Sequence, residues 1–396
     1  MSQRTALICG AGIAGATLAY WLGKAGINAT LVERAPRPRT GGYIIDFWGR
    51  GYDIAEKMGL LPELKAAGYD VRELRIVNAK GRRVGGFGVD VFRELTGGRY
   101  VSVARADLAR LIHNKIEPGF ATLFGDSIIR IQQGEAVVDV EFEHAPRRRF
   151  DFVVGADGLH SAVRRLVFGA QDRYEKYLGY YVAAFAVDDY RQRDERVYVS
   201  YEMPGKQIAR FAMREGRTLF LLVFAADQPL PIDPRDAVSQ KARLHCEFDR
   251  GGWECPAIMA ELDRCDDLYF DPVSQIRMDT WSKGRVALVG DAAFCPSLLA
   301  GQGSALAMTA AYVLAGELAA ADRPQAAFVR YEQLLQPFIR GKQEAAERFA
   351  RSFAPKTQFG LFVRNQVTKA FAVPLVASLT LGRLVRDAID LPTYST

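Results

Sequence analysis

The spacing of apolar residues near the start of the chain predicts one strand-helix-strand unit. Apolar residues dominate 5–9 and 28–33, which is typical of buried strands. Between them, residues 14–24 are mostly small and apolar, which we interpret as a helix. Strands that alternate with helices form parallel sheets in α/β proteins. We therefore predict an α/β fold with a Rossmann-like domain at the N-terminus.

From residue 74 the pattern changes to short strands separated by glycine-bearing turns. We predict strands at 74–78, 83–87 and 100–103, followed by a helix at 105–116 whose apolar residues have helical spacing. Further strands follow one another within residues 180–226, which predicts an antiparallel meander. This second pattern indicates a separate antiparallel sheet.

The α/β pattern returns in the last third of the chain. A strand is predicted at 285–290 and a long helix at 304–320. The remaining residues are interpreted as helices that are broken at three prolines, Pro337, Pro355 and Pro374. The sequence therefore predicts C-terminal helices in addition to the two sheets.

The composition narrows the class of protein. A chain of 396 residues is long enough for two or three domains, and 49% hydrophobic with 25% charged residues is typical of a globular protein. The net charge of +6 lies partly in short arginine runs such as 147–149, without a nucleic-acid-binding motif. We expect no nucleic-acid partner and a monomeric protein.

The arrangement of cysteines, histidines and apolar segments argues against metal-binding, disulfide-rich, secreted and membrane-spanning classes of protein. The five cysteines form no CxxC pair and the four histidines are scattered, so we expect neither a metal site nor a disulfide scaffold. The first residues lack the pattern of a signal peptide, which predicts a cytoplasmic protein. The most apolar late segment, 370–384, is shorter than the roughly 20 residues that a membrane-spanning helix needs. We therefore expect no integral membrane segment.

A glycine-rich turn between the first strand and the first helix carries the strongest signal for a ligand. Its sequence is Gly10-Ala11-Gly12-Ile13-Ala14-Gly15. The first glycine suits a tight turn, the second lets the backbone approach a pyrophosphate, and the third allows close helix packing. Glu33 ends the second strand, where a carboxylate can accept a hydrogen bond from a ribose hydroxyl. We predict a dinucleotide site here.

The segment after Glu33 is basic and rich in proline and glycine, which predicts a loop. Arg34 and Arg39 in this loop are candidates to face phosphates, and an exposed loop without ligand contacts is the alternative. Asp46 follows within an apolar run, where an isolated carboxylate needs a partner.

Two later turns also follow apolar strands. Asp157-Gly158 comes after the strand that ends near residue 154, and Gly290-Asp291 ends the strand at 285–290. Asp291 thus stands where α/β sheets present ligands, and its carboxylate suits a polyol, with a helix cap as the alternative. Asp157 is equally well interpreted as a helix cap with Arg164 as its ion partner.

These three turns occur in the order found in class A flavoprotein monooxygenases, the superfamily of para-hydroxybenzoate hydroxylase. The chain resembles that family over nearly its whole length. The resemblance implies a FAD-binding domain of the glutathione reductase type, formed by residues 1–73, 99–172 and 271–342. It also implies an antiparallel-sheet substrate domain, formed by 74–98 and 173–270, and a helical bridge at 343–396.

The resemblance assigns further cofactor contacts. Gly301, Gly303 and Ser304 open the long helix, so that free N–H groups can face the flavin edge where reduced flavin carries negative charge. The turn at Asp157 touches the FAD pyrophosphate region and the path of NAD(P)H. Arg105 matches a family arginine that contacts the flavin or its phosphates, and a surface arginine is the alternative.

Within the family, the glycine pair 41–42 followed by Asp46 is similar to the tetracycline-inactivating and antibiotic-tailoring monooxygenases. In those enzymes an arginine before the glycine pair and the following aspartate lie near the flavin, which maps onto Arg39 and Asp46.

Alternation along the meander places Phe211 and Met213 on one face of a strand and Arg210 on the other. The apolar face is suited to a flat aromatic substrate, and ordinary sheet packing is the alternative. Our candidates for substrate contact are Phe185, Phe211, Met213 and Pro296.

The resemblance implies a FAD-dependent, NAD(P)H-consuming monooxygenase. Such an enzyme hydroxylates an aromatic or polyketide-like molecule through a flavin C4a-hydroperoxide, with O2 as the oxygen source. No catalytic side chain is assigned. A reductase of the same fold is the alternative, and a flavin-holding protein with a binding role is a further one. A halogenase is disfavoured, because the halogenase-like motif Trp-x-Trp-x-Ile-Pro is missing: the segment 252–256 has only one tryptophan.

Overall fold

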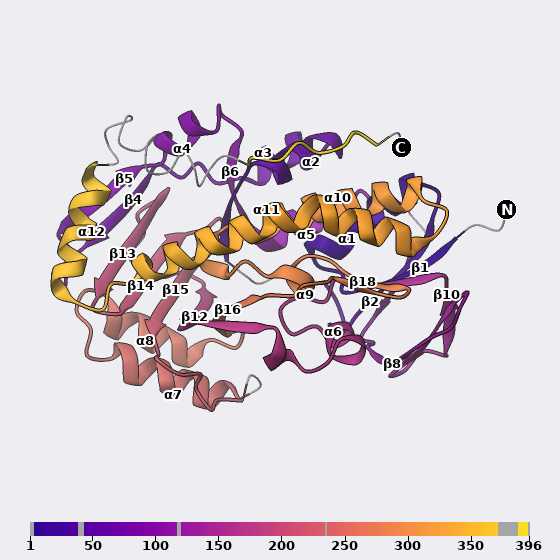
Figure 1. Ribbon diagram of the computed structural model, residues 1–396. Helices are drawn as coiled ribbons and strands as arrows, with labels where there is room; N and C mark the ends of the chain where they lie inside the picture. The colour runs from indigo at the N-terminus through magenta and orange to yellow at the C-terminus, as the bar shows by residue number, and fades with distance from the viewer. Residues whose placement is uncertain (1–3, 39–42, 117–119, 234–235, 371–386, 395–396) are drawn as a thin grey trace.

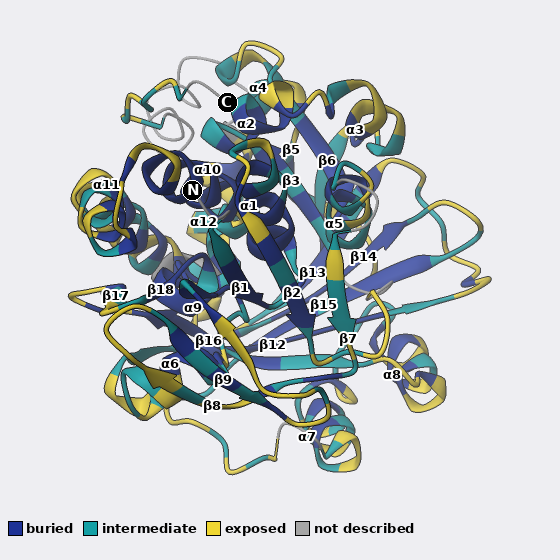
Figure 2. Cartoon of the chain, turned by 90° about the vertical axis from the view of Figure 1, so that its right-hand side faces the viewer, coloured by how far each residue is buried: buried dark blue, intermediate teal, exposed yellow. Residues whose placement is uncertain are grey.

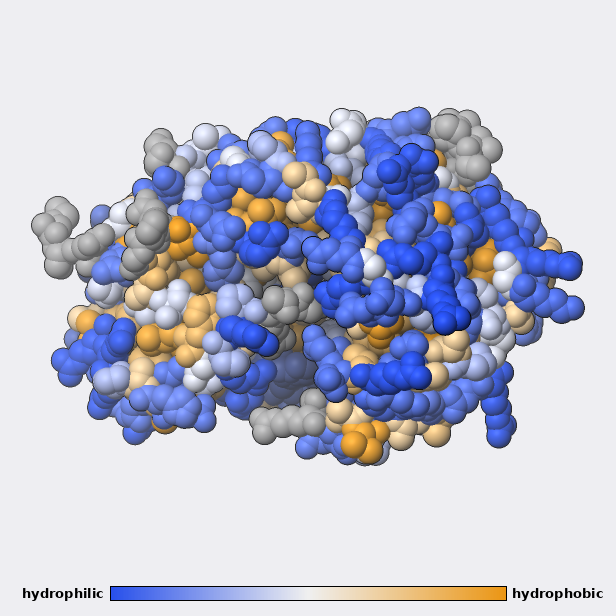
Figure 3. Space-filling view, turned by 180° about the vertical axis from the view of Figure 1, so that it is seen from behind, coloured by the Kyte–Doolittle hydropathy of each residue, from blue (hydrophilic) through white to orange (hydrophobic). Residues whose placement is uncertain are grey.

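Two sheets, one mostly parallel and one mostly antiparallel, form the frame of the structure (Figure 1). The computed structural model describes residues 4–38, 43–116, 120–233, 236–370 and 387–394. The helix α11 (Pro324–Phe353) runs along the molecule from one sheet toward the other (Figure 1). Seen from behind, most of the surface is hydrophilic, and it is hollowed near its centre (Figure 3).

The six-stranded sheet has the order β17-β18-β11-β1-β2-β7, and all its pairs are parallel except the edge pair β17–β18. All residues of β11 and β18 are buried, as expected for a parallel sheet covered on both faces. The predicted strand-helix-strand unit is confirmed, because β1 and β2 have the predicted bounds. The strands are β1 (Thr5–Cys9), β2 (Asn28–Glu33), β7 (Ala121–Phe124), β11 (Phe152–Gly155), β17 (Ser282–Lys283) and β18 (Val286–Leu288).

Helices cover the parallel sheet. The helix α1 (Ile13–Lys24) packs against α10 (Gly303–Ala320) and α5 (Arg105–His113). By length and composition α10 is apolar enough to cross a membrane, but 78% of it is buried inside the fold. Figure 2 shows α10 and α1 as mostly buried elements. We interpret α10 as a core helix, which the small residues along it allow to pack closely.

The seven-stranded sheet has the order β16-β12-β15-β14-β13-β4-β5. It contains the strands of the predicted meander, β12 to β15, and joins them to β4 and β5 from the segment before residue 99. Only β13, β14 and β15 form a meander, because β12 pairs with β15 and β16 and not with β13. The helices α7 (Ala237–Phe248) and α8 (Cys255–Arg264) pack on one face, which we call the outer face; the opposite one is the inner face. The strands are β4 (Glu73–Val77), β5 (Arg83–Gly88), β12 (Glu175–Val187), β13 (Val197–Met203), β14 (Lys206–Ala212), β15 (Thr218–Ala225) and β16 (Tyr269–Ile276).

Smaller elements connect the two sheets. The strands β3 (Ile44–Trp48) and β6 (Tyr100–Ala104) form an antiparallel pair. In the sequence, β3 comes before β4 and β6 comes after β5, so the pair encloses the first two strands of the seven-stranded sheet. The helices of this region are α2 (Arg50–Lys57), α3 (Leu61–Ala67) and α4 (Asp90–Leu95). Further elements are β8 (Ile128–Gln133), β9 (Val138–Phe142), β10 (Arg148–Phe150), α6 (Ala162–Val167), α9 (Asp291–Phe294) and α12 (Gln358–Ala370).

The structure corrects three sequence predictions. The helix α11 continues through Pro337, although a break was predicted there. Buried residues at helical spacing on both sides of the proline, such as Tyr331 and Ile339, hold the helix together across the missing hydrogen bond. The strand predicted to end near residue 154 is β11, which ends at Gly155, and a separate strand, β10, lies directly before it and pairs in another sheet. The helices α7 and α8 were not predicted, because α7 buries few apolar residues and has a weak periodic signal.

Candidate functional site

The three turns singled out from the sequence meet at one edge of the parallel sheet. β1 ends at Cys9, β11 at Gly155 and β18 at Leu288, and these strands are neighbours. Because parallel strands place their carboxyl ends at the same edge, the turns that follow them lie side by side. This edge is where open α/β sheets bind ligands.

The glycines of the first turn have the backbone conformation and close packing that the sequence predicts. Gly10 has a φ of +99°, and a Cβ there would lie 2.5 Å from the carbonyl oxygen of Ala156. A Cβ on Gly15 would overlap the carbonyl oxygen of Gly10. In contrast, a Cβ on Gly12 would meet no heavy atom within 4 Å. The backbone is therefore closely packed at Gly10 and Gly15 and open at Gly12, where a ligand can approach.

The start of α1 is suited to bind an anion. Its N-cap is Gly12, and no side chain caps the first turn, so N–H groups there are available to a phosphate. Glu33 is held beside this turn, because its carboxylate accepts hydrogen bonds from the N–H groups of Ala11 and Ala35, both at 2.9 Å. Arg34 is exposed, and Arg39 lies outside the described residues.

Asp291 lies between the start of α10 and the charge of Arg105. A Cβ on Gly290, which has a φ of +66°, would lie 2.9 Å from the Cβ of Ala14, so this turn packs on the start of α1. A Cβ on Gly303 would lie 3.7 Å from Asp291 Oδ1. Burial raises the pKa of the Asp291 carboxyl, and the positive charge of Arg105 partly offsets this effect. The predicted residues Asp291, Arg105 and Gly303 are thus brought together.

The segment before α10 brings a second open helix start to the same place. Gly301 has a φ of +66°, which favours glycine, and α10 begins without a side-chain cap. Ser304 lies in its first turn and is partly buried. Pro296 is buried, and its carbonyl oxygen accepts a hydrogen bond from Gln275 Nε2 at 2.9 Å. The N–H groups at the start of α10 favour negative charge on a bound group.

Asp157 binds the first turn of α6. Its carboxylate accepts hydrogen bonds from Ser161 Oγ at 2.5 Å and from the N–H groups of Ala162 and Val163 at 2.7 and 3.1 Å. Burial raises the pKa of this carboxyl, and these hydrogen bonds lower it in part. Asp157 therefore supports the first turn of α6, as the capping interpretation expects, although the N-cap residue itself is Ser161. A contact of Asp157 with the cofactor stays a prediction.

Arg164 joins two of the turns and was not assigned this role from the sequence. It is fully buried; its Nη1 donates to the carbonyl oxygen of Ala292 at 2.8 Å, and its Nη2 donates to that of Leu159 at 2.5 Å. No hydrogen bond or ion pair joins Arg164 to Asp157 in the described part of the chain, so the prediction of an ion pair between them is wrong. Two backbone carbonyls are its main partners, and they tie the turn after β11 to the helix after β18.

Asp46 has its partners on the neighbouring strand. β3 and β6 are in register so that Asp46 lies opposite Ser102. Ser102 Oγ donates to Asp46 Oδ1 at 2.6 Å, and the Tyr100 hydroxyl donates to the same oxygen at 2.5 Å. Burial raises the pKa of Asp46, and the two hydrogen bonds lower it in part. Two hydroxyls therefore meet the predicted need for a partner, and a contact with the flavin stays a prediction.

Phe211 and Met213 lie in a small hydrophobic cluster on the inner face of the second sheet. The ring of Phe211 stacks on Tyr198 with centroids 4.4 Å apart, and Tyr69 meets it edge-on at 5.4 Å. Tyr100 of β6 packs in the same cluster. We call Tyr69, Tyr100, Tyr198 and Phe211 the aromatic cluster. It joins the inner face to the strand pair that carries Asp46.

Phe185 is a correction to the predicted substrate contacts. It pairs with Phe220 across β12 and β15, and Phe220 pairs with Arg210 across β15 and β14, so all three share one face. Phe185 is buried in the core under α7 and α8. The prediction that Phe185 lines a cavity with Phe211 is wrong, because strand alternation sends Phe211 to the inner face.

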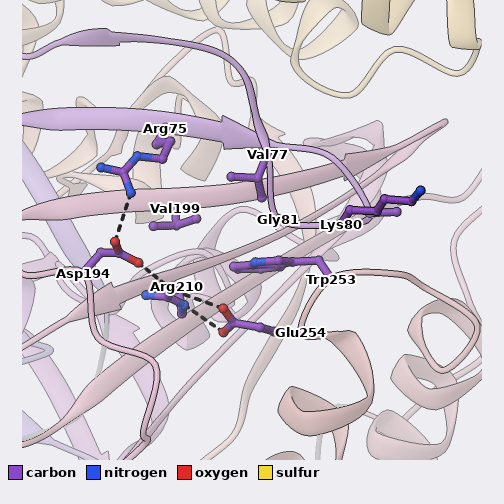
Figure 4. Close-up of a pocket in the computed structure, with 10 residues that line it drawn as sticks. Arg75, Val77, Lys80, Gly81, Asp194, Val199, Arg210, Trp253 and Glu254 are labelled. Atoms are coloured by element: carbon purple, nitrogen blue, oxygen red, sulfur yellow. Dashed lines mark hydrogen bonds and ion pairs between the residues drawn. The ribbon is translucent and has the colours of Figure 1, made fainter.

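A polar pocket of about 450 Å³ opens on the outer face (Figure 4). Arg210 crosses its floor, where Nε donates to Glu254 Oε2 at 2.8 Å and Nη2 donates to Asp194 Oδ2 at 2.7 Å. Arg75 binds the other oxygen of Asp194 at 2.9 Å, and Trp253 forms a side wall. Ion pairs within the pocket satisfy these charges, and the sheet separates them from the aromatic cluster.

Comparison with known proteins decides the family. A family model described as "FAD binding domain" matches residues 3–340. The chain belongs to this FAD-binding family. A flavin-dependent monooxygenase from an unknown prokaryotic organism is 35% identical over 98% of both chains. This membership confirms the resemblance to the class A flavoprotein monooxygenases and the Rossmann-like fold.

Solved structures of similar proteins have the same fold. The tetracycline destructase Tet(55) has a TM-score of 0.85 and 32% identity over 99% of both chains. Klebsiella pneumoniae HpxO complexed with FAD and uric acid has a TM-score of 0.80 over 97% of both chains, and at 22% identity it supports the fold alone. The protein is a FAD-dependent monooxygenase of this family.

The residues at the sheet edge fit FAD. The open space at Gly12 and the uncapped start of α1 suit the pyrophosphate, and Glu33 suits the adenosine ribose. The partly buried carboxylate of Asp291 suits the ribityl hydroxyls, and the uncapped start of α10 suits the pyrimidine edge of the flavin.

We expect Asp291→Asn to weaken FAD binding at least about tenfold, because an amide accepts hydrogen bonds from hydroxyls less strongly than a carboxylate. The free energy of unfolding without FAD should not fall at neutral pH. Burial raises the pKa of Asp291, so its ionised form is disfavoured in the fold, and the stability of the unsubstituted protein relative to Asp291→Asn should rise as the pH falls toward that pKa. Flavin fluorescence titration and urea unfolding at several pH values check both effects. Unchanged FAD affinity would refute the assigned role.

Proposed function

We propose that this enzyme uses NAD(P)H and O2 to add one oxygen atom to a flat, hydroxyl-bearing aromatic or polyketide-like molecule, of which the tetracyclines are one example. The observation that carries the proposal is the aromatic cluster, which presents stacked rings beside a carboxylate on the inner face of the second sheet. The 32% identity to a tetracycline destructase over 99% of both chains supports the same substrate class.

The chain supplies binding, orientation and electrostatics. Bound FAD would supply the redox chemistry: once reduced, it would activate O2 for transfer of one oxygen atom. The start of α10 has no side-chain cap, so its first N–H groups and the helix dipole would stabilise negative charge on the pyrimidine edge of a flavin bound there. The rings of Tyr198 and Phe211 stack on one another, and Phe211 is buried, so this part of the aromatic cluster forms an apolar wall that excludes water. We assign NAD(P)H as a transient reductant, because the sequence holds a single GxGxxG turn, and FAD accounts for it.

The test is oxidation of NAD(P)H in air by the FAD-loaded protein with a panel of phenols, anthraquinones and tetracyclines. We expect a few compounds with a ring hydroxyl to accelerate oxidation at least about tenfold, and their product mass to increase by one oxygen. Substrate-stimulated oxidation with loss of a double bond in the product, and no oxygen gained, would instead identify a reductase.

A further inference from the structure

The polar pocket on the outer face lies over three neighbouring strands of the seven-stranded sheet. Its floor includes one row of paired residues, in which Arg75 of β4 lies opposite Val199 of β13, and Val199 lies opposite Arg210 of β14. Neighbouring residues on a strand face opposite sides of a sheet, so Phe211, which follows Arg210, lies in the aromatic cluster of the inner face. The volume of about 450 Å³ lies within the range of roughly 300–1,000 Å³ that small-molecule sites have. The pocket is therefore large enough for a ligand of its own, with the sheet between it and the inner face.

One wall of the pocket is the indole ring of Trp253, which the fold holds in an uncommon backbone conformation (Figure 4). Trp253 has a φ of +54°, in the left-handed region that bulky residues rarely adopt. Its N–H group donates to the carbonyl oxygen of Ala79 at 2.7 Å, and a Cβ on Gly252 would lie 2.5 Å from the Cβ of Ala79. The segment before α8 is thus held against the turn between β4 and β5. Strained backbone of this kind persists only where the surrounding structure fixes it, and it is concentrated at functional sites.

The carboxylates of the pocket are already bound, whereas several of its donors are not. Asp194 accepts a hydrogen bond on each oxygen, from Arg75 at 2.9 Å and from Arg210 at 2.7 Å. Arg210 also donates to both oxygens of Glu254, at 2.8 and 3.1 Å. Within the described part of the chain, no hydrogen bond is donated by Arg75 Nε, Arg210 Nη1 or Lys80 Nζ, and the two arginine nitrogens are not sealed from solvent. A ligand in the pocket therefore meets donors whose hydrogen bonds it can accept.

The charge of the pocket favours the same kind of ligand. Its lining has one cation more than it has carboxylates: Arg75, Lys80 and Arg210 against Asp194 and Glu254. Lys80 is exposed in the turn at the rim, and no ion pair joins it to a residue that the structure describes. A recess of net positive charge attracts anions, and planar arginine donors match the geometry of a carboxylate. The ligand that fits the polar part of the pocket is thus a carboxylate.

We propose that this pocket binds a small aromatic carboxylate, at a site separate from the flavin. The aromatic ring lies against the indole ring of Trp253 and the buried side chain of Val77. The carboxylate accepts hydrogen bonds from the free donors of Arg75 and Arg210, and Lys80 adds its charge at the rim. The inference does not depend on the proposed reaction, because no residue of the pocket belongs to the predicted flavin site.

The first test measures binding of 2-naphthoate to the FAD-loaded protein by titration calorimetry, with 2-naphthamide as a neutral compound of similar shape. We expect 2-naphthoate to bind at least about tenfold more tightly, because only its carboxylate is attracted by the excess positive charge and pairs with arginine. Its affinity should also fall as the salt concentration rises. Absence of 2-naphthoate binding would overturn the site, and equal affinity for both compounds would overturn the proposed class of ligand.

Trp253→Asn locates the bound ring. Asparagine adopts a left-handed conformation more readily than tryptophan does, so the variant removes the ring without adding strain. We expect the affinity for 2-naphthoate to fall at least about tenfold. Glu215→Asn is the matched control, because Glu215 also has a left-handed φ, +58°, but is exposed in the turn between β14 and β15, outside the pocket, and it should leave the affinity unchanged. 2-Naphthoate that binds at the flavin instead would bind equally to Trp253→Asn and to the unsubstituted protein, which would overturn the proposal.

Two lysine variants make the test independent of the packing around Trp253. Lys80→Gln removes a charge from an exposed turn, so the protein should fold normally, and it should weaken 2-naphthoate binding about threefold. Lys24→Gln removes the same charge from the exposed end of α1 and should leave the affinity unchanged. If Trp253→Asn fails to retain FAD after gel filtration, this pair decides, and equal 2-naphthoate affinity in the two lysine variants would overturn the proposal.

Discussion

Gly12→Val is expected to lower the affinity for FAD at least about 100-fold, or about 2.7 kcal/mol, while the protein without FAD still folds. The position has φ −74° and ψ −169°, an extended conformation that valine adopts readily. No heavy atom lies within 4 Å of a Cβ there, so the side chain enters the space through which the pyrophosphate must approach. Valine is a poorer N-cap residue than glycine, so we expect the apoprotein to lose about 1 kcal/mol of stability. FAD retained after gel filtration and urea unfolding of the apoprotein measure the two effects.

Gly23→Val is the matched control for this substitution. Gly23 lies in the same helix, α1, and a Cβ there also meets nothing within 4 Å, but it is remote from the sheet edge. We expect normal FAD binding in this variant. Equal FAD binding by Gly12→Val and the unsubstituted protein would contradict the placement of the pyrophosphate.

Arg164→Met should destabilise the protein by about 2–4 kcal/mol, because it leaves two buried carbonyl groups, those of Ala292 and Leu159, without their donor. The same change frees the turn after β11 from the helix after β18, so FAD binding should weaken as well. Urea unfolding with a fixed slope measures the first effect.

Arg165→Met is the control for the buried arginine, since Arg165 is the next residue of α6 and is exposed. Its unfolding free energy should change by less than about 0.5 kcal/mol. A loss of stability of the same size in both variants would show that α6 itself, and not the link to α9, is sensitive to the substitution.

The cofactor site was predictable because its signals are local in sequence. Each turn stands directly after an apolar strand, and parallel pairing alone brings Gly10, Asp157 and Asp291 to one edge. The glycine roles were predictable for the same reason, since a tight turn and a close helix approach depend on neighbours within a few residues. Glu33 was predicted from its spacing in the sequence relative to the glycine-rich turn.

The residues proposed to lie on the substrate side were harder to predict, because they come from strands that are distant in sequence. Tyr100 and Ser102 meet Asp46 only through the register of β3 and β6, which no local pattern specifies. Phe185 was misplaced because the face of a residue on β12 depends on its pairing with β15. Arg164 was given the wrong partner, because the nearer charge in sequence is Asp157 while the carbonyl of Ala292 arrives from a distant strand.

The most direct test of the account is the fate of isotope-labelled O2 in single turnovers of the FAD-loaded enzyme, reduced by NAD(P)H, with a phenolic or tetracycline-like substrate. We expect one labelled oxygen atom in the product and none taken from water. A product that carries no labelled oxygen, although the substrate is consumed and NAD(P)H is oxidised, would contradict it.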